Sequence, residues 1–176
     1  GILTTADSIT PEERSSPKEI NEGKPLTFVN IPISCGSEIG GVSKSRWAEA
    51  EIIGKDIRNI LDVDPKAKIG VITFYSAQSK LITNHIDNVL NDEEKNNIEI
   101  GTVDAFQGKE FDYVLLSCVR SNHGKDGNPP AVGFLEKPNR LCVAFSRSIR
   151  QLVVYGDAET LIQVHCFSKL YDICAI

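Results

Sequence analysis

Four adjacent residues between two apolar runs have side chains and backbones suited to binding a phosphorylated ligand. They are Gln107, Gly108, Lys109 and Glu110. Gly108 can adopt backbone conformations that a side chain would forbid, which lets amide groups approach a phosphate closely. Glu110 offers a carboxylate acceptor for a sugar hydroxyl or a bound metal. A hairpin-like turn with a solvated charge pair would have the same composition, so these residues alone leave both interpretations open.

The elements that flank this link are typical of a parallel sheet. Residues 98–103 and 113–119 form continuous apolar, β-rich runs, as buried parallel strands do. Open α/β sheets bind their ligands beyond the carboxyl ends of the strands. We therefore expect the 107–110 link to lie at that edge of the sheet.

The rest of the chain alternates predicted strands with predicted helices. Further strands are expected at 26–33, 68–75 and 151–156, and helices at 47–61, 76–90, 139–148, 157–165 and 168–173. This alternation predicts an α/β fold with a mainly parallel sheet covered by helices on both faces. We assign the polar residues 1–25 to an extended lead-in or surface loop without a core role, and residues 26–176 to one domain.

Two of these helices have an amphipathic pattern. The inner face of the first is expected to carry Trp47, Ala50, Ile53, Ile57 and Ile60, and that of the second Leu81, Ile82, His85, Ile86 and Val89. Glu49 and Glu51 lie near the start of the first helix and match its dipole. We interpret Trp47 as a packing anchor and His85 as a partly buried, hydrogen-bonded imidazole.

Composition excludes several classes of protein. A net charge of −5 over 176 residues argues against wrapping nucleic acid by bulk electrostatics, although it permits local phosphate contacts. The five cysteines form no C-x-x-C pair and the histidines show no ligand spacing with them, so we expect no metal site and a reducing, intracellular setting, cytoplasmic or nuclear. No run could cross a membrane. The lack of any methionine predicts a piece of a longer protein.

A glycine loop at 36–45 has part of the pattern of a phosphate-binding P-loop. A P-loop needs its lysine directly after the last glycine, but Val42 and Ser43 separate Gly41 from Lys44. We predict a flexible loop without P-loop function. An independent α/β nucleotide-binding enzyme that uses this loop as its phosphate site is the least favoured alternative.

Several segments together resemble the second RecA-like domain of superfamily 1 helicases. They read I-G-V-I-T-F-Y-S-A-Q at 69–78, T-V-D-A-F-Q-G-K-E-F-D-Y-V-L-L-S-C-V-R-S at 102–121 and R-L-C-V-A-F-S-R-S at 140–148. The segment E-A-E-I-I at 49–53 resembles the family's preceding helix. The resemblance is narrowest to the branch that holds the nonsense-mediated-decay RNA helicase and its DNA-helicase relatives. These motifs span roughly residues 26–158 in the family's order and spacing.

The resemblance implies a RecA-like fold and a role for each matching residue. Arg147 resembles the arginine finger of motif VI, which stabilises the charge of a transferring phosphoryl group. Glu110 and Gly108 resemble nucleotide contacts of motif V, and Arg150 is a candidate for a second motif VI charge. Thr73 and Thr102 resemble the hydroxyl residues that hold the backbone of a single strand of DNA or RNA. Asp104 and Gln107 resemble the residues that link the strand site to the nucleotide site. ATP with magnesium would be held mainly by an N-terminal RecA-like domain, because this chain has no phosphate-binding lysine motif.

The chain departs from the family pattern in motif VI. Cys142 stands where the family usually has asparagine, Phe145 where it has leucine, and Ile149 where it has the second arginine. Phe74 replaces a proline. These departures motivate an alternative function, a degenerate helicase-like binding module without ATPase activity. Arg120 and Arg140 have a simpler interpretation as surface ion-pair partners.

Overall fold

The computed structural model describes residues 15–124 and 127–174, which form a five-stranded parallel sheet between two layers of helices. The strand order is β1-β5-β4-β2-β3. The strands are β1 (Leu26–Asn30), β2 (Ile69–Thr73), β3 (Ile98–Thr102), β4 (Phe111–Ser117) and β5 (Ser148–Gly156). The predicted α/β class with a parallel sheet is confirmed.

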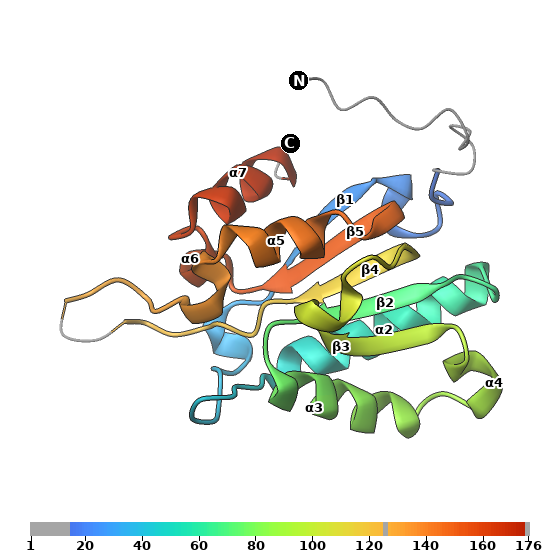
Figure 1. The fold of residues 1–176 in the computed structure, drawn as a ribbon, viewed down its shortest axis with the longest axis horizontal. Helices are drawn as coiled ribbons and strands as arrows, with labels where there is room; N and C mark the ends of the chain where they lie inside the picture. The colour runs from blue at the N-terminus through green and yellow to red at the C-terminus, as the bar shows by residue number, and fades with distance from the viewer. Residues whose placement is uncertain (1–14, 125–126, 175–176) are drawn as a thin grey trace.

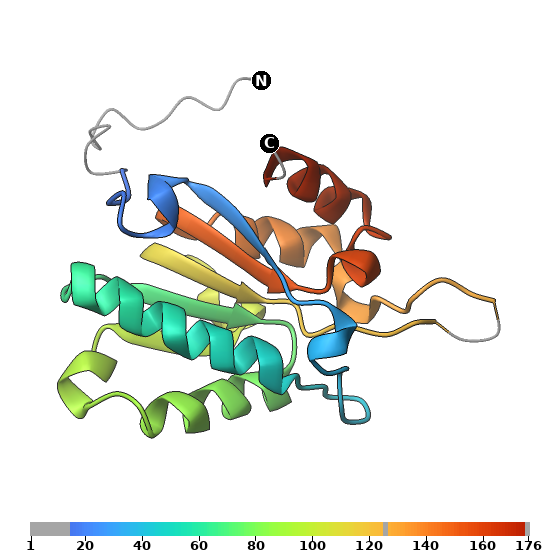
Figure 2. The same cartoon turned by 180° about the vertical axis from the view of Figure 1, so that it is seen from behind.

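Helices cover both faces of this sheet (Figures 1 and 2). One layer contains α2 (Trp47–Val63) and α3 (Ser76–Asp87), and the other contains α5 (Pro138–Phe145) and α7 (His165–Cys174). The shorter helices are α4 (Asp92–Lys95), α6 (Ala158–Leu161) and the 3-10 turns η1 (Asn21–Gly23), η2 (Ile33–Cys35), η3 (Val103–Phe106) and η4 (Gly133–Glu136).

The alternating side chains of the strands form a separate apolar core on each face. Leu115 and Val153 pack with Ile53 and Ile57 of α2, while the next residue of β4, Leu116, belongs to the core under α5 and α7. This period of two is the geometry of an extended strand, in which neighbouring side chains point to opposite faces. Because both faces are covered, the middle strands read as continuous apolar runs.

Several predicted boundaries and faces are wrong in detail. The strand predicted at 26–33 ends at Asn30, and Pro32 is the N-cap of the turn η2. Trp47 is 54% exposed and packs edge to face against His85, with 5.1 Å between the two ring centres, so it covers the end of the helix pair rather than the core. Val89 is 46% exposed because α3 ends at Asp87.

The proposed lead-in is also partly wrong. Ile20 is 4% exposed and belongs to the core under α2, and Gln151 of β5 hydrogen-bonds to Asn21 and to the carbonyl of Lys24. Residues 15–25 therefore help to close this core. The expectation for residues 1–14 lies outside the described residues, and the boundary at 25/26 stays a prediction.

The link between β3 and β4 runs from one edge of the sheet to the other. It leaves the carboxyl end of β3 at Thr102, forms η3, and enters the amino end of β4 at Phe111. The prediction that the whole 107–110 link lies at the carboxyl edge is therefore wrong, because a connection between two successive parallel strands of one sheet must return to the amino edge. The beginning of the link therefore lies at the carboxyl edge of the sheet, and its end lies at the amino edge.

Candidate functional site

Arg147 and Glu110 lie next to each other at the amino edge of the sheet. The backbone nitrogen of Phe111 donates to the carbonyl of Arg147 at 3.0 Å, where β4 and β5 begin side by side. The Nη1 of Arg147 donates to the carbonyl of Lys109 at 3.2 Å. The structure thus brings the candidate finger and the 108–110 segment together, as the motif pattern predicts.

Only neutral oxygen atoms hold the guanidinium of Arg147 in the described part of the chain. Besides the Lys109 carbonyl, Nε donates to the carbonyl of Val143 at 3.0 Å and Nη2 donates to the hydroxyl of Ser146 at 2.7 Å. The other described arginines pair with carboxylates: Arg46 with Glu49, Arg58 with Glu94, Arg120 with Glu38, Arg140 with Asp104 and Arg150 with Asp64. Among the described residues, Arg147 is therefore the arginine whose charge has no carboxylate partner.

Gly108 adopts the backbone conformation that makes it useful near a phosphate. Its φ is +79°, and a Cβ at this position would have nothing within 4 Å. Glu110 is exposed two residues further on, and Lys109 between them pairs with Glu99. The segment is open to solvent, so a ligand could reach both the glycine backbone and the Glu110 carboxylate.

Replacing Gly108 with alanine should destabilise the chain through backbone strain alone. The left-handed region is unfavourable for a side chain by about 1 kcal/mol, and no steric contact adds to this. Urea unfolding should therefore show a loss of about 1 kcal/mol for Gly108→Ala. Gly41→Ala is the matched control, because that exposed glycine also has open space around a Cβ and no positive φ. Equal stability of the two variants would contradict the argument.

The carboxyl edge of the sheet carries the candidate nucleic-acid contacts. Thr73, Thr102 and Ser117 end three neighbouring strands and are paired in register. Thr102 is half-buried, but Thr73 is 0% exposed, and its hydroxyl has no hydrogen-bond partner among the described residues. In this structure Thr73 cannot touch a strand at the surface. Its predicted contact would require the end of β2 to open, so the role stays a prediction.

A cavity of about 250 Å³ lies beside Thr102 at this edge. Asp104 and Arg140 line it and form an ion pair at 2.8 Å, and Ser43 and Phe134 also line it. The sequence-based interpretation of Arg140 as an ion-pair partner is therefore confirmed. Gln107 is exposed just beyond η3. Hydroxyl, amide and guanidinium donors at a surface cavity are the groups that contact a nucleic-acid backbone.

Arg150 does not share the environment of Arg147. Its Nη1 donates to Asp64, at the end of α2, at 2.9 Å, and its Nε lies 3.5 Å from Asp112. Two carboxylates thus balance its charge, with Asp64 on the α2 side of the sheet. Its predicted contact with a nucleotide would require these ion pairs to break, and it stays a prediction.

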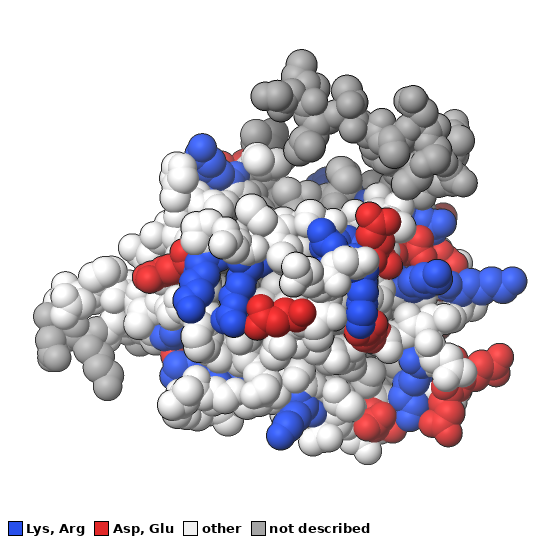
Figure 3. All heavy atoms as spheres, in the orientation of Figure 1, with Lys and Arg blue, Asp and Glu red and all other residues white. Residues whose placement is uncertain are grey.

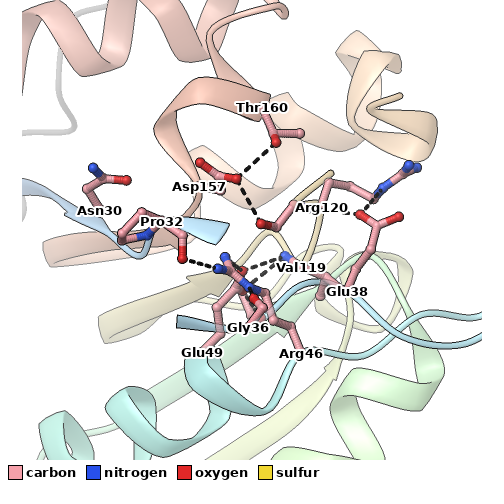
Figure 4. A network of polar contacts seen from close by, with 12 residues as sticks. Asn30, Pro32, Gly36, Glu38, Arg46, Glu49, Val119, Arg120, Asp157 and Thr160 are labelled. Atoms are coloured by element: carbon pink, nitrogen blue, oxygen red, sulfur yellow. Dashed lines mark hydrogen bonds and ion pairs between the residues drawn. The ribbon is translucent and has the colours of Figure 1, made fainter. Parts of the chain in front are cut away.

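A buried polar cluster behind the carboxyl edge was missed in the sequence (Figure 4). Glu49 is 0% exposed and accepts hydrogen bonds from the hydroxyl of Ser117 at 2.6 Å and from the backbone nitrogen of Val119 at 2.9 Å. Arg46 pairs with it at 3.4 Å, and Gln78 donates to Ser117 at 3.0 Å. Val119 has a φ of +69°, which is unfavourable for a β-branched residue. The cluster therefore fixes a strained turn at the end of β4.

The spacing in the sequence did contain a signal for this cluster. Glu49 precedes Ile53 by four residues and so lies on the apolar face of the helix, where a carboxylate needs a buried partner. Burial raises its pKa to about 7, although the hydrogen bond from Ser117, the Arg46 charge and the Val119 amide act in the opposite direction. Interpreting Glu49 only as a charge that matches the helix dipole overlooked its position on the apolar face of the helix.

A second carboxylate holds the chain after β4 in place. Glu38 accepts from Nε of Arg120 and from the backbone nitrogen of Ser121, both at 2.8 Å, and pairs with Lys44 at 3.2 Å. Burial alone would raise its pKa, but the bonds from Arg120 and Ser121 hold the pKa below its usual value. The Lys44 charge is thus already balanced, which disfavours the 36–45 loop as a phosphate site.

The described residues hold no obvious magnesium or membrane site. No group of three or more His, Cys, Asp or Glu side chains among them could hold a metal ion. No described helix is long and apolar enough to cross a membrane.

Comparisons with known proteins agree with these motifs. The AAA domain family matches residues 1–159. The chain is 38% identical over 140 residues, 78% of its length, to Regulator of nonsense transcripts 1 of Dictyostelium discoideum, and 43% identical over 121 residues, 68% of its length, to DNA polymerase alpha-associated DNA helicase A of Saccharomyces cerevisiae. It spans only 10% and 16% of the lengths of these relatives.

A solved structure has the same fold. The C-terminal domain of a possible DNA helicase from Lactobacillus plantarum superposes with a TM-score of 0.51 and 14% sequence identity, covering 80% of each chain. The family match and the helicase relatives together place the motifs in their family. The chain belongs to the AAA domain family, as the second RecA-like domain of a superfamily 1 helicase in the branch that holds the nonsense-mediated-decay RNA helicase and its DNA-helicase relatives.

Proposed function

We propose that this chain is the C-terminal motor domain of an ATP-dependent nucleic-acid helicase. An N-terminal RecA-like domain of the same protein would hold ATP and magnesium, and this domain would close over the nucleotide. Arg147 would act as the arginine finger, with the Gly108 backbone and the Glu110 carboxylate contacting the nucleotide. Alternate opening and closing of the cleft would then move the protein along a single strand.

The observation that carries this proposal is the environment of Arg147. Three neutral acceptors fix its guanidinium beside the 109–110 segment, and no described carboxylate balances its charge. A positioned cation of this kind can stabilise negative charge that develops on a phosphoryl group without first breaking an ion pair. The fixed geometry also limits the entropy lost when the nucleotide is engaged.

The opposite edge supports a role in gripping the strand. Thr102, Asp104 and Gln107 follow each other from the carboxyl end of β3 along the link that ends at Glu110. Contacts at Thr102 would hold the sugar-phosphate backbone, which suits both DNA and RNA. The same short segment would then touch the strand at one end and the nucleotide at the other.

The alternative function is a helicase-like binding module that has lost its motor activity. The departures in motif VI favour it, and Arg150 supplies no obvious replacement for the second arginine because it pairs with Asp64 and Asp112. Cys142 is exposed and Phe145 half-buried on α5. Arg147 nevertheless has only neutral acceptors among the described residues, which favours the motor.

Nucleic-acid-stimulated ATP hydrolysis distinguishes the two functions. We expect the full-length protein to hydrolyse ATP faster when a single strand is added, and the isolated 176-residue chain to show no hydrolysis above background. A steady-state phosphate-release assay of both proteins, with and without oligonucleotide, provides the measurement. A full-length protein that binds a strand but never hydrolyses ATP would support the binding module.

A further inference from the structure

We propose that Arg140 binds the phosphate backbone of a nucleic-acid strand, and that Asp104 pairs with Arg140 when no strand is present. Helix α5 then couples the contact between Arg140 and the strand to the position of Arg147. The inference rests on the proposed function and deepens it. It names a residue outside the predicted site that makes ATP hydrolysis respond to the strand.

The ion pair at the carboxyl edge is accessible and easily exchanged. Arg140 Nη2 donates to Asp104 Oδ2 at 2.8 Å, with side chains 29% and 65% exposed. Exposed pairs of this kind contribute little to stability, so another anion can replace the carboxylate at small cost. Both residues line the cavity beside Thr102, where the hydroxyl and the planar guanidinium could hold one phosphate together.

An aromatic ring keeps the guanidinium at this cavity. The Arg140 guanidinium carbon lies 5.2 Å from the centre of the Phe134 ring, and the Lys137 ammonium lies 5.5 Å from it. Stacking on the ring would orient Arg140 even after Asp104 is released. Figure 3 shows basic and acidic side chains close together on the face that carries α5 and η4. Lys137 therefore adds a second positive charge beside the exchangeable pair.

Helix α5 connects this cavity to the nucleotide edge. Arg140 lies in its first turn, and Arg147 lies two residues after its end and donates to the Val143 carbonyl on the same helix. The helix packs along η3, which carries Asp104, while Lys109 follows η3 at the other end. Two polar contacts therefore join the two segments in addition to their apolar packing, Arg140 with Asp104 at one edge and Arg147 with Lys109 at the other.

This arrangement gives a direct route from the strand to the finger. When a phosphate replaces Asp104 at Arg140, one of the two polar contacts between α5 and the 103–110 segment is lost, while the apolar packing of Leu141 and Ala144 remains. The remaining packing permits only a small displacement of the helix, and this displacement changes where Arg147 lies against the 109–110 backbone. Strand binding and the position of the finger become linked through a single helix of eight residues.

The test measures binding and hydrolysis in the full-length protein with oligothymidylate and oligouridylate. Arg140→Ala should lower the affinity for both oligonucleotides by about tenfold, the effect of losing one charge-assisted hydrogen bond. The slope of log affinity against log salt concentration should become shallower by about 0.7, as expected when one phosphate contact with a single strand is lost. The kcat of ATP hydrolysis at saturating strand should also fall, because the strand no longer acts on α5.

Two further variants test the exchange itself. Asp104→Asn should strengthen strand binding, because the competing carboxylate is gone, and Asp104→Asn combined with Arg140→Ala should bind like Arg140→Ala alone. Arg58→Ala is the matched control, since Arg58 also forms a partly exposed pair, with Glu94, but on the α2 face. It should leave affinity and salt slope unchanged.

The outcomes separate this inference from the proposed function. If the wild type binds a strand and hydrolyses ATP while Arg140→Ala keeps its affinity and salt slope, only the inference is overturned. An affinity loss with an unchanged kcat at saturating strand would overturn the coupling through α5. If the wild type neither binds a strand nor hydrolyses ATP, the proposed function and the inference both fail.

Discussion

In the full-length protein, Arg147→Ala should lower nucleic-acid-stimulated ATP hydrolysis by about a thousandfold, the lower end of what arginine fingers contribute. The loss should appear in kcat and in kcat/KM alike, because the guanidinium would act on charge that forms only in the transition state. Strand affinity should change little, since Arg147 lies at the amino edge and the strand cavity at the carboxyl edge. Steady-state kinetics at saturating oligonucleotide measure both parameters.

Two controls show whether the loss of hydrolysis comes from the missing guanidinium or from a disturbed fold. Arg147→Lys keeps the charge but not the planar fork that the three neutral acceptors hold, so it should recover only a small part of the activity. Thermal unfolding of each variant shows whether the lost hydrogen bonds have disturbed the fold. A well-folded Arg147→Ala protein with nearly normal kcat would exclude the arginine-finger role.

The sequence predicted the sheet well because its signals were local. Runs such as 69–73 and 113–117 are mostly apolar and carry no charged residue, which is typical of strands covered on both faces, and the structure buries them completely. The errors occur where contacts between residues far apart in the sequence determine which side chains are buried. Ile20 looked like part of a polar lead-in, yet it closes the core under α2. Nothing in the neighbouring residues could reveal that contact.

The sequence predicted those features of the candidate site that follow from the order of the motifs along the chain. The motif order indicated that Arg147 and Glu110 would meet, and the start of β4 beside β5 brings them together. The course of the link from one edge to the other was overlooked, although two successive parallel strands of one sheet already require it. Thr73 shows a limit of the sequence itself: its type suits a backbone contact, but only the tertiary structure reveals its burial.

The buried cluster at the end of β4 should be the most sensitive point for stability. Glu49→Ala removes the acceptor for the Ser117 hydroxyl and the Val119 amide and leaves the Arg46 charge buried without its carboxylate. Breaking such a buried pair destabilises proteins by about 3–5 kcal/mol, a large share of a typical folding free energy. Urea unfolding above about pH 8, where the Glu49 carboxyl is ionised, measures the loss. Glu51→Ala, two residues along the same helix at an exposed pair with Lys55, should change stability little.

The same carboxylate predicts how stability depends on pH. Burial raises the pKa of Glu49 from 4.5 to about 7 in the folded chain, so the folded state keeps a proton that the unfolded state releases. The stability that this proton contributes is therefore complete below about pH 4.5 and is lost as the pH rises towards 7. A shift of this size corresponds to about 3 kcal/mol. Relative to Glu49→Gln, which cannot titrate, the wild type should lose about this much unfolding free energy across that range in a urea series. A constant difference between the two proteins would mean that Glu49 stays ionised throughout and that Arg46 balances its charge.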